Sequence, residues 1–224
     1  LTGGQASATL VENITVIVSA PVGEELCKAL AVFSLAGLID SKKRGFQVGF
    51  TVGLGFALLE NLQYILFSLF AGEVMAFSYG LTTVVRGIGS IPGHAMWTAC
   101  SGYAIGHMLE QRKQPDRIPD VKQWNLVNPL NPSASRFEPS FASHPSFFSK
   151  SSNLQLPTSL PVMLGIAMFG HAFWNGSSVL MSYMSGNLDP VVGLIAELTW
   201  IVVLIALLWT FGRFVLAAAM EDDV

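Results

Sequence analysis

The segment Pro21-Val22-Gly23-Glu24-Glu25-Leu26-Cys27-Lys28 places two carboxylates and an ammonium inside a long apolar run. A charged side chain near the centre of a membrane-spanning helix costs about 2.5–3.5 kcal/mol on insertion scales, so such residues are rarely kept for packing alone. We therefore expect Glu24, Glu25 and Lys28 to belong to a functional site, and the apolar residues around them to form membrane helices.

The composition of the chain supports this expectation. Of the 224 residues, 51% are hydrophobic and 12% are charged, whereas a soluble domain carries about 25% charged residues. Apolar runs of about 20 residues, long enough to cross the hydrocarbon core of a bilayer, recur along the sequence. The pattern predicts an all-α, polytopic transmembrane helical bundle with about five to six membrane segments, in contact with the lipid bilayer of the cell (cytoplasmic) membrane. A net charge of −3 without a basic stripe gives no reason to expect nucleic acid as a partner.

The chain is expected to have four parts. Residues 1–110 would form membrane helices, and residues 111–156, rich in Pro, Ser, Asn and charge, would form an irregular cytoplasmic loop. Residues 157–215 would form further membrane helices, and residues 216–224 a cytoplasmic tail. The individual spans are expected at about 9–39, 45–71, 91–110, 158–184 and 190–214, with residues 74–88 tilted, interfacial or re-entrant.

Basic residues indicate the orientation of the chain. In a five-crossing arrangement, Lys42, Lys43 and Arg44 fall on the same side as the basic residues of the 111–156 loop, and the other side has none. Cytoplasmic flanks are enriched in Lys and Arg, so the loop and the C-terminus are expected in the cytoplasm. The chain begins at Leu1 without methionine or a signal-peptide pattern, so we expect it to be processed or to lack upstream sequence.

Polar residues on four separate segments share one expected depth. With a rise of about 1.5 Å per residue, each lies roughly 20–24 Å from the cytoplasmic end of its own helix. These residues are Glu24, Glu60, His94 and His171. Unrelated residues rarely agree in depth across several helices, so we expect the four to meet in one layer, in the non-cytoplasmic half of the membrane.

Within these segments, functional groups recur four positions apart, which places them on one helical face. The pairs are Glu24 and Lys28, Phe56 and Glu60, His94 and Thr98, and His171 and Asn175. Each face can point into a common water-accessible pocket. A structural explanation exists for each pair alone, such as a buried ion pair or hydrogen bonding between helices, but the shared depth favours function. Arg86 is expected either to neutralise this site or to lie at an interface, and Glu197 is a more distant candidate.

Carboxylates and imidazoles that meet in a low-dielectric pocket suit the activation of water. One glutamate can act as a general base while another group returns the proton to a leaving amine. His171 and Asn175, on one face, can donate hydrogen bonds to a developing oxyanion. The residues therefore predict peptide hydrolysis without a serine or cysteine nucleophile.

Four motifs in this order resemble those of the PrsW family of intramembrane proteases. They are EExxK at Glu24 to Lys28, FxxxEN at Phe56 to Asn61, HxxxT at His94 to Thr98, and HxxWN at His171 to Asn175. The resemblance covers about residues 20–176, without the 111–156 loop, and the family belongs to the clan of the ABI-type CAAX prenyl endopeptidases. It implies an intramembrane endopeptidase that cleaves a membrane-embedded or membrane-proximal protein.

The resemblance also implies roles for individual residues. Glu24 and Glu25 would be catalytic carboxylates, Glu60 and His94 would position or polarise water, and His171 with Asn175 would stabilise the oxyanion. Supporting positions would be Lys28, Asn61, Thr98 and Asn175. Zinc is a possible cofactor, with Glu60, His94 and His171 as its ligands, but the sequence has no HExxH-type motif, which favours a glutamate-activated water without a committed metal.

Two other functions fit part of the pattern. A proton- or ion-coupled transporter would also bury Glu, Lys and His in the membrane, but such proteins usually show internal repeats, and none is found between the two halves. A catalytically silent scaffold of the same clan would be expected to lose the paired glutamates, which this chain retains. The sequence therefore favours the protease.

Overall fold

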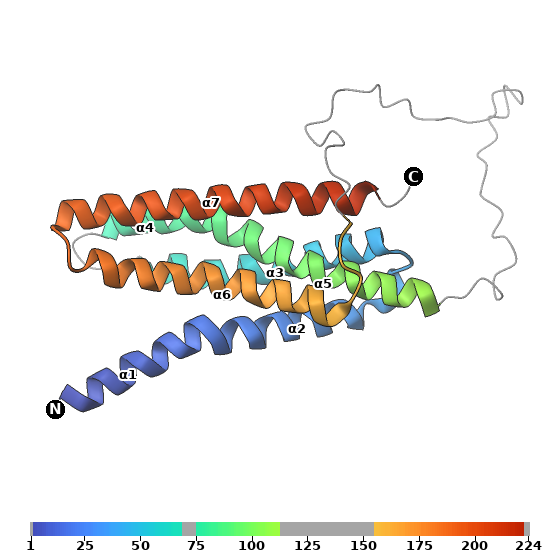
Figure 1. The fold of residues 1–224 in the computed structure, drawn as a ribbon, viewed down its shortest axis with the longest axis horizontal. Helices are drawn as coiled ribbons and strands as arrows, with labels where there is room; N and C mark the ends of the chain where they lie inside the picture. Colours follow the sequence, from blue (N-terminus) through green and yellow to red (C-terminus); the bar gives the residue numbers. More distant parts are fainter. Residues whose placement is uncertain (1, 69–74, 113–154, 222–224) are drawn as a thin grey trace, which may run out of the picture.

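The computed structural model describes residues 2–68, 75–112 and 155–221, and these residues form helices joined by short connections, with no strand among them. Most of the helices run roughly parallel to the long axis of the molecule (Figure 1). The predicted all-α class is confirmed for this part of the chain. The predicted loop at 111–156 lies almost entirely outside the described residues.

The N-terminal segment is one interrupted helix. Helix α1 (Thr2–Ile14) passes through a π-helical turn, η1 (Thr15–Ser19), into α2 (Ala20–Ser34), which is followed by a 3₁₀ turn, η2 (Ala36–Leu38). Pro21 has no backbone N–H to donate within the helix, and the wide turn η1 lies directly upstream of it. The first helix begins at Thr2, earlier than the span expected at 9–39. Helix α1 leaves the bundle at an angle (Figure 1).

The middle of the chain contains two long helical segments. The first is α3 (Lys42–Ser68), and the second consists of α4 (Met75–Val85), the π-helical turn η4 (Arg86–Ser90) and α5 (Ile91–Arg112). Residues 74–88 were expected to be tilted, interfacial or re-entrant, and to form a segment apart from the span at 91–110. The separation from that span is wrong, because α4 continues through η4 into α5 without leaving the helical path.

The last two helices form an antiparallel pair. Helix α6 (Leu160–Ser185) and helix α7 (Pro190–Glu221) are joined by residues 186–189. Asp189 caps α7, because its Oδ1 accepts hydrogen bonds from the backbone N–H groups of Val191 at 3.0 Å and Val192 at 3.4 Å. Helix α7 reaches Glu221, so the part of the expected tail that the structure describes is helical.

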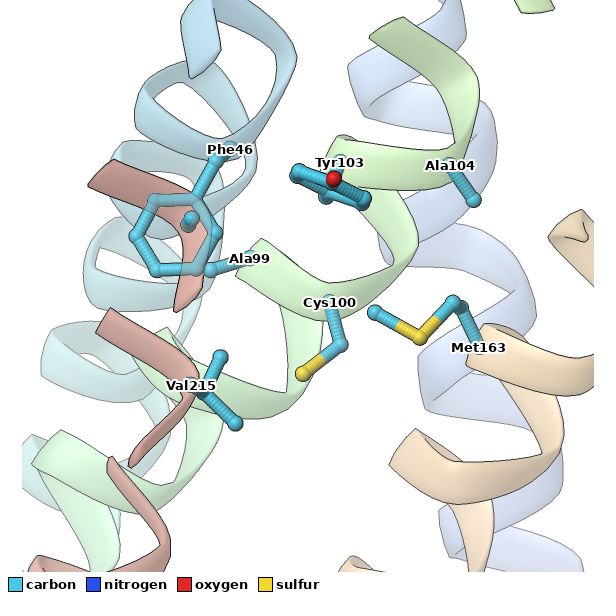
Figure 2. Close-up of a cluster of buried hydrophobic side chains, with 8 residues drawn as sticks. Phe46, Ala99, Cys100, Tyr103, Ala104, Met163 and Val215 are labelled. Carbon is cyan, nitrogen blue, oxygen red and sulfur yellow. The ribbon is translucent and has the colours of Figure 1, made fainter. Parts of the chain in front are cut away.

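Helix α5 lies at the centre of the bundle. Nearly all of its residues from 93 to 106 are buried, and it packs against α2, α3, α6 and α7. Figure 2 shows the largest core cluster, in which Ala99, Cys100, Tyr103 and Ala104 of α5 meet side chains of the neighbouring helices. These partners are Phe46 from α3, Met163 from α6, and Val215 from α7. A residue placed on α5 can therefore contact several helices at once.

Helices α3 and α5 approach each other through glycines. A Cβ atom at Gly49 would lie 2.5 Å from the Thr98 carbonyl oxygen, and one at Gly106 would lie 2.5 Å from the Ser41 carbonyl oxygen. Small residues at such positions let two helix backbones come close together. Gly49 and Gly53 lie against α5 in this way, whereas at Gly55 no described atom lies within 4 Å of an added Cβ.

The outer surface of the bundle is strongly apolar. Leu59 is 70% exposed, and Phe67 and Phe169 are each 71% exposed, among many other exposed large hydrophobic residues. Large apolar surfaces of this kind mark contact with a membrane or a partner. By length and composition, the described helices include two that can cross a membrane, Lys42–Phe67 and Pro190–Ala219. Helices α5 and α6 carry several polar residues, which lowers their mean hydropathy.

Candidate active site

A buried triad of charges on α2 forms one wall of the site. Lys28 Nζ lies 2.8 Å from Glu25 Oε1 and 3.3 Å from Glu24 Oε2. The spacings of three and four residues put all three side chains on one helical face. The Glu25 side chain is fully buried, whereas that of Glu24 is 23% exposed, so the two neighbouring carboxylates differ in their access to water.

His94 of α5 joins this triad to α3. Its Nδ1 lies 2.7 Å from Lys28 Nζ, and its Nε2 lies 2.9 Å from Glu60 Oε2. A neutral imidazole has one donor and one acceptor nitrogen. Because the Lys28 ammonium can only donate, Nδ1 accepts its hydrogen bond, which leaves the proton of a neutral ring on Nε2, the nitrogen within ion-pair distance of Glu60. The imidazole thus links an ammonium on one helix to a carboxylate on another.

His171 of α6 completes the cluster from the other side. Its Nδ1 lies 3.2 Å from Glu25 Oε1 and 4.0 Å from Glu24 Oε2. The ring centroids of His94 and His171 are 4.6 Å apart, and Trp97 stacks on His171 at 5.0 Å with an angle of 13° between the planes. Residues from four helices therefore meet, as their shared expected depth predicted.

Arg86 also belongs to the cluster, which the sequence did not decide. Its Nη2 lies 3.5 Å from Glu60 Oε1, its Nε donates to Asn61 Oδ1, and its guanidinium carbon lies 3.7 Å from the centroid of the Tyr64 ring. Of the two expectations for this residue, charge neutralisation of the site agrees with these contacts. The signal in the sequence was a second basic residue within an apolar segment.

Two cavities open beside the cluster. The larger, of about 550 Å³, is lined by Glu24, Glu60, His94 and Arg86 together with residues of η1, α6 and α7. The smaller, of about 490 Å³, lies along α3 and reaches the same two carboxylates, Glu24 and Glu60. Both carboxylates therefore face cavities, while Glu25 lies behind them.

The remaining expected site residues have more distant positions. Asn175 lines the larger cavity, but its amide nitrogen donates to the Val16 carbonyl at 2.9 Å. Thr98 is fully buried, and its Oγ1 has no hydrogen-bond partner among the described residues. Glu197 lines the far part of the larger cavity, where it accepts a hydrogen bond from Ser185 Oγ. None of these three contacts the histidines through a hydrogen bond in the described structure.

Three residues of the cluster have the chemistry of a metal site. One ligand atom each from Glu24, His94 and His171 lies within 4.8 Å of the others. Two imidazoles and a carboxylate are a common protein ligand set of catalytic zinc, which keeps a further coordination position for water or substrate. The set expected from the sequence had Glu60 as its carboxylate; in the structure, Glu60 instead contacts Nε2 of His94.

Comparisons with known proteins define the class. A family model described as PrsW family intramembrane metalloprotease matches residues 2–129. The match spans more than half of the chain and includes the motifs on α2, α3 and α5, so the chain belongs to the PrsW family. It begins earlier than the resemblance from about residue 20 and extends into the 111–156 loop, but it does not include His171. No curated protein and no solved structure matches the chain.

Proposed function

We propose that this chain is an intramembrane endopeptidase that hydrolyses a peptide bond of a membrane-embedded or membrane-proximal protein. The observation that carries the proposal is the convergence of Glu24, His94 and His171, whose donor atoms lie within 4.8 Å of one another beside a cavity of about 550 Å³. An extended peptide segment can enter such a cavity, and family membership supports hydrolysis as the reaction.

The donor set fits the metalloprotease class given in the description of the family, so Glu24, His94 and His171 would hold the ion. When bound, a zinc-like ion supplies a reactive water at neutral pH and polarises the peptide carbonyl. The protein's own groups hold and move protons. Of the three glutamates, Glu24 and Glu60 face the cavities, and Glu24 would hold the ion, so we assign the proton of the attacking water to Glu60.

The other residues hold the reacting groups in place. Glu25 is buried and its Oε1 lies 3.2 Å from Nδ1 of His171, so its role is to orient that ring. Lys28 balances the charge of Glu24 and Glu25. The amide nitrogen of Asn175 carries two N–H groups, of which one donates to the Val16 carbonyl oxygen, so the other can stabilise the oxyanion. His171 would use one ring nitrogen for the ion and faces Glu25 with the other. Asn61 and Thr98 support the helices around the site.

The proposal includes a multi-pass arrangement in the cytoplasmic membrane. The apolar outer surface and the two helices that meet the length and composition criteria support membrane insertion. The positive flanks favour a cytoplasmic position for residues 111–156 and for the C-terminus. Labelling of single cysteines introduced between residues 120 and 150 tests this orientation, because impermeant reagents added outside intact cells should not reach them.

The decisive experiment is cleavage by the purified full chain reconstituted in liposomes. A panel of fluorescently labelled single-span membrane proteins serves as substrate, with and without a chelator and with zinc added back. We expect Glu24→Gln and His171→Ala to lose cleavage, and the exposed control Glu110→Gln to retain it. Cleavage at the wild-type rate by both Glu24→Gln and Glu25→Gln would overturn the carboxylate mechanism, and insensitivity to the chelator would overturn the metal.

A further inference from the structure

We propose that Arg86 is a positioning residue for this reaction, because its guanidinium fixes the carboxylate of Glu60, which in turn fixes the ring of His94. The role deepens the proposed function and rests on it. Arg86 lies outside the four sequence motifs, and its contacts with Asn61, Glu60 and Tyr64 place it in the site.

The guanidinium is held on α3 at three points. Its Nε donates to Asn61 Oδ1, its Nη2 lies 3.5 Å from Glu60 Oε1, and its carbon lies 3.7 Å from the Tyr64 ring centroid. Asn61 is itself buried and anchored, because its Nδ2 donates to the Ala57 carbonyl oxygen at 2.6 Å. A planar fork of donors held at several points has little freedom to turn.

The two oxygens of Glu60 have different partners. Oε1 faces Arg86 at 3.5 Å, and Oε2 lies 2.9 Å from His94 Nε2. With Oε1 held by the guanidinium, the carboxylate presents Oε2 to the imidazole in a fixed orientation. A carboxylate this close to the outer nitrogen of a histidine favours the tautomer that carries its proton there and limits rotation of the ring, and loss of such a partner typically costs 10- to 100-fold in activity or metal affinity.

The π-helical turn explains why Arg86 and His94 reach the same carboxylate. In a regular α-helix, eight residues turn by about 800°, which would leave the two side chains about 80° apart. A π turn takes up about one residue more than an α turn, so the effective separation across η4 is close to seven residues, about 700°, and the two side chains face nearly the same way. η4 (Arg86–Ser90) lies between them.

An alternative role for Arg86 is direct contact with substrate, because the residue also lines the larger cavity. The contacts of its guanidinium favour positioning, since Nε donates to Asn61 and Nη2 forms an ion pair with Glu60, both on α3. The two roles differ in their kinetic effects. A positioning residue changes kcat with little change in KM, whereas a residue that binds substrate in the ground state changes KM.

The first test is spectroscopic and needs no substrate. The chain contains four histidines, so ¹⁵N-labelled histidine side chains of the full chain in detergent give few signals, and His94→Gln assigns those of His94. We expect Arg86→Met and Glu60→Gln to shift the His94 signals in the same way. The matched control is Arg44→Met, which removes an exposed arginine that contacts Gln47 at 3.3 Å. Unchanged His94 signals in folded Arg86→Met would overturn the proposal.

The second test is kinetic and uses the labelled single-span panel. We expect Arg86→Met to lower kcat about 10- to 100-fold with KM changed less than twofold, and Arg86→Lys to recover part of the loss. The double variant Glu60→Gln/Arg86→Met should be no slower than Glu60→Gln alone, because both act on one interaction. A raised KM at unchanged kcat, or losses that multiply, would overturn positioning. If wild type cleaves no panel member, the proposed function fails, while the histidine spectra still decide the role of Arg86.

Discussion

The Nε2 atom of His94 and the Oε2 atom of Glu60 lie 2.9 Å apart, although the two residues come from different helices. At the opposite nitrogen, His94 Nδ1 lies 2.7 Å from Lys28 Nζ on a third helix. One imidazole therefore connects α2, α3 and α5. Substitution of Glu60 or Lys28 is therefore expected to change the orientation of the His94 ring and to leave the backbone of α5 in place.

Zinc binding is expected to depend on the side chains of Glu24, His94 and His171. The wild-type chain, purified without chelator and then titrated with zinc, should bind one ion, and Glu24→Gln and His171→Ala should each abolish this binding, because each removes a ligand. Glu60→Gln should weaken it only about 10- to 100-fold, as the loss of an outer partner of a ligand does. Elemental analysis measures the number of bound ions, and isothermal titration measures the affinity. Equal losses in Glu60→Gln and Glu24→Gln would contradict this assignment of ligands.

Lys28→Met is expected to bind zinc more tightly than wild type. The ammonium lies 2.7 Å from His94 Nδ1 and 3.3 Å from Glu24 Oε2, so it competes with a cation for both. A unit charge at about 4 Å is worth about 4 kcal/mol at an effective dielectric constant of about 20, and we expect a gain of at least about tenfold. Competition with a fluorescent chelator measures the affinity, and Lys43→Met, at the start of α3, serves as the control. A weaker affinity would contradict the prediction.

Glu25→Gln is expected to destabilise the fold more than Glu24→Gln. Glu25 is fully buried, and its Oε1 lies 2.8 Å from Lys28 Nζ and 3.2 Å from His171 Nδ1, whereas Glu24 is partly exposed. Removal of one partner of a buried ion pair costs about 3–5 kcal/mol, and we expect the lower end because Glu24 still faces Lys28. Thermal unfolding in detergent measures the difference. A larger loss of stability in Glu24→Gln than in Glu25→Gln would show that the ion pair of Lys28 with Glu24 is the one that stabilises the fold.

Gly49→Val is expected to disrupt the packing of α3 on α5. An added Cβ would lie 2.5 Å from the Thr98 carbonyl oxygen, which is a backbone atom and cannot move aside alone. Overpacking costs about 1–3 kcal/mol and occasionally more, so the midpoint of thermal unfolding should fall by several degrees. Gly55→Val is the matched control, because no described atom lies within 4 Å of its added Cβ. Equal effects of the two substitutions would contradict the close contact.

Much of the site could be predicted from the sequence. Charge within apolar segments identified Glu24, Glu25 and Lys28 because burial of charge is costly, and helix rise alone brought Glu60, His94 and His171 to the same depth. The continuity of α4 with α5 was not predicted, because Gly87, Gly89 and Pro92 suggest a break, whereas the two glycines lie within the wide turn η4 and Pro92 lies in the first turn of α5. The sequence also does not separate Gly49 from Gly55, because spacing does not tell which glycine faces a neighbouring helix.

The sequence by itself determined the helical class, the membrane character and the set of ionisable residues, because hydropathy, helical periodicity and the cost of buried charge are local properties. Only the tertiary structure decided how these residues pair. In the structure, Glu25 lies behind Glu24, and Glu60 contacts His94 and Arg86. The possible metal ligands are Glu24, His94 and His171, without Glu60. Such pairings depend on the rotation of each helix about its own axis, which the packing of α3, α6 and α7 around α5 fixes.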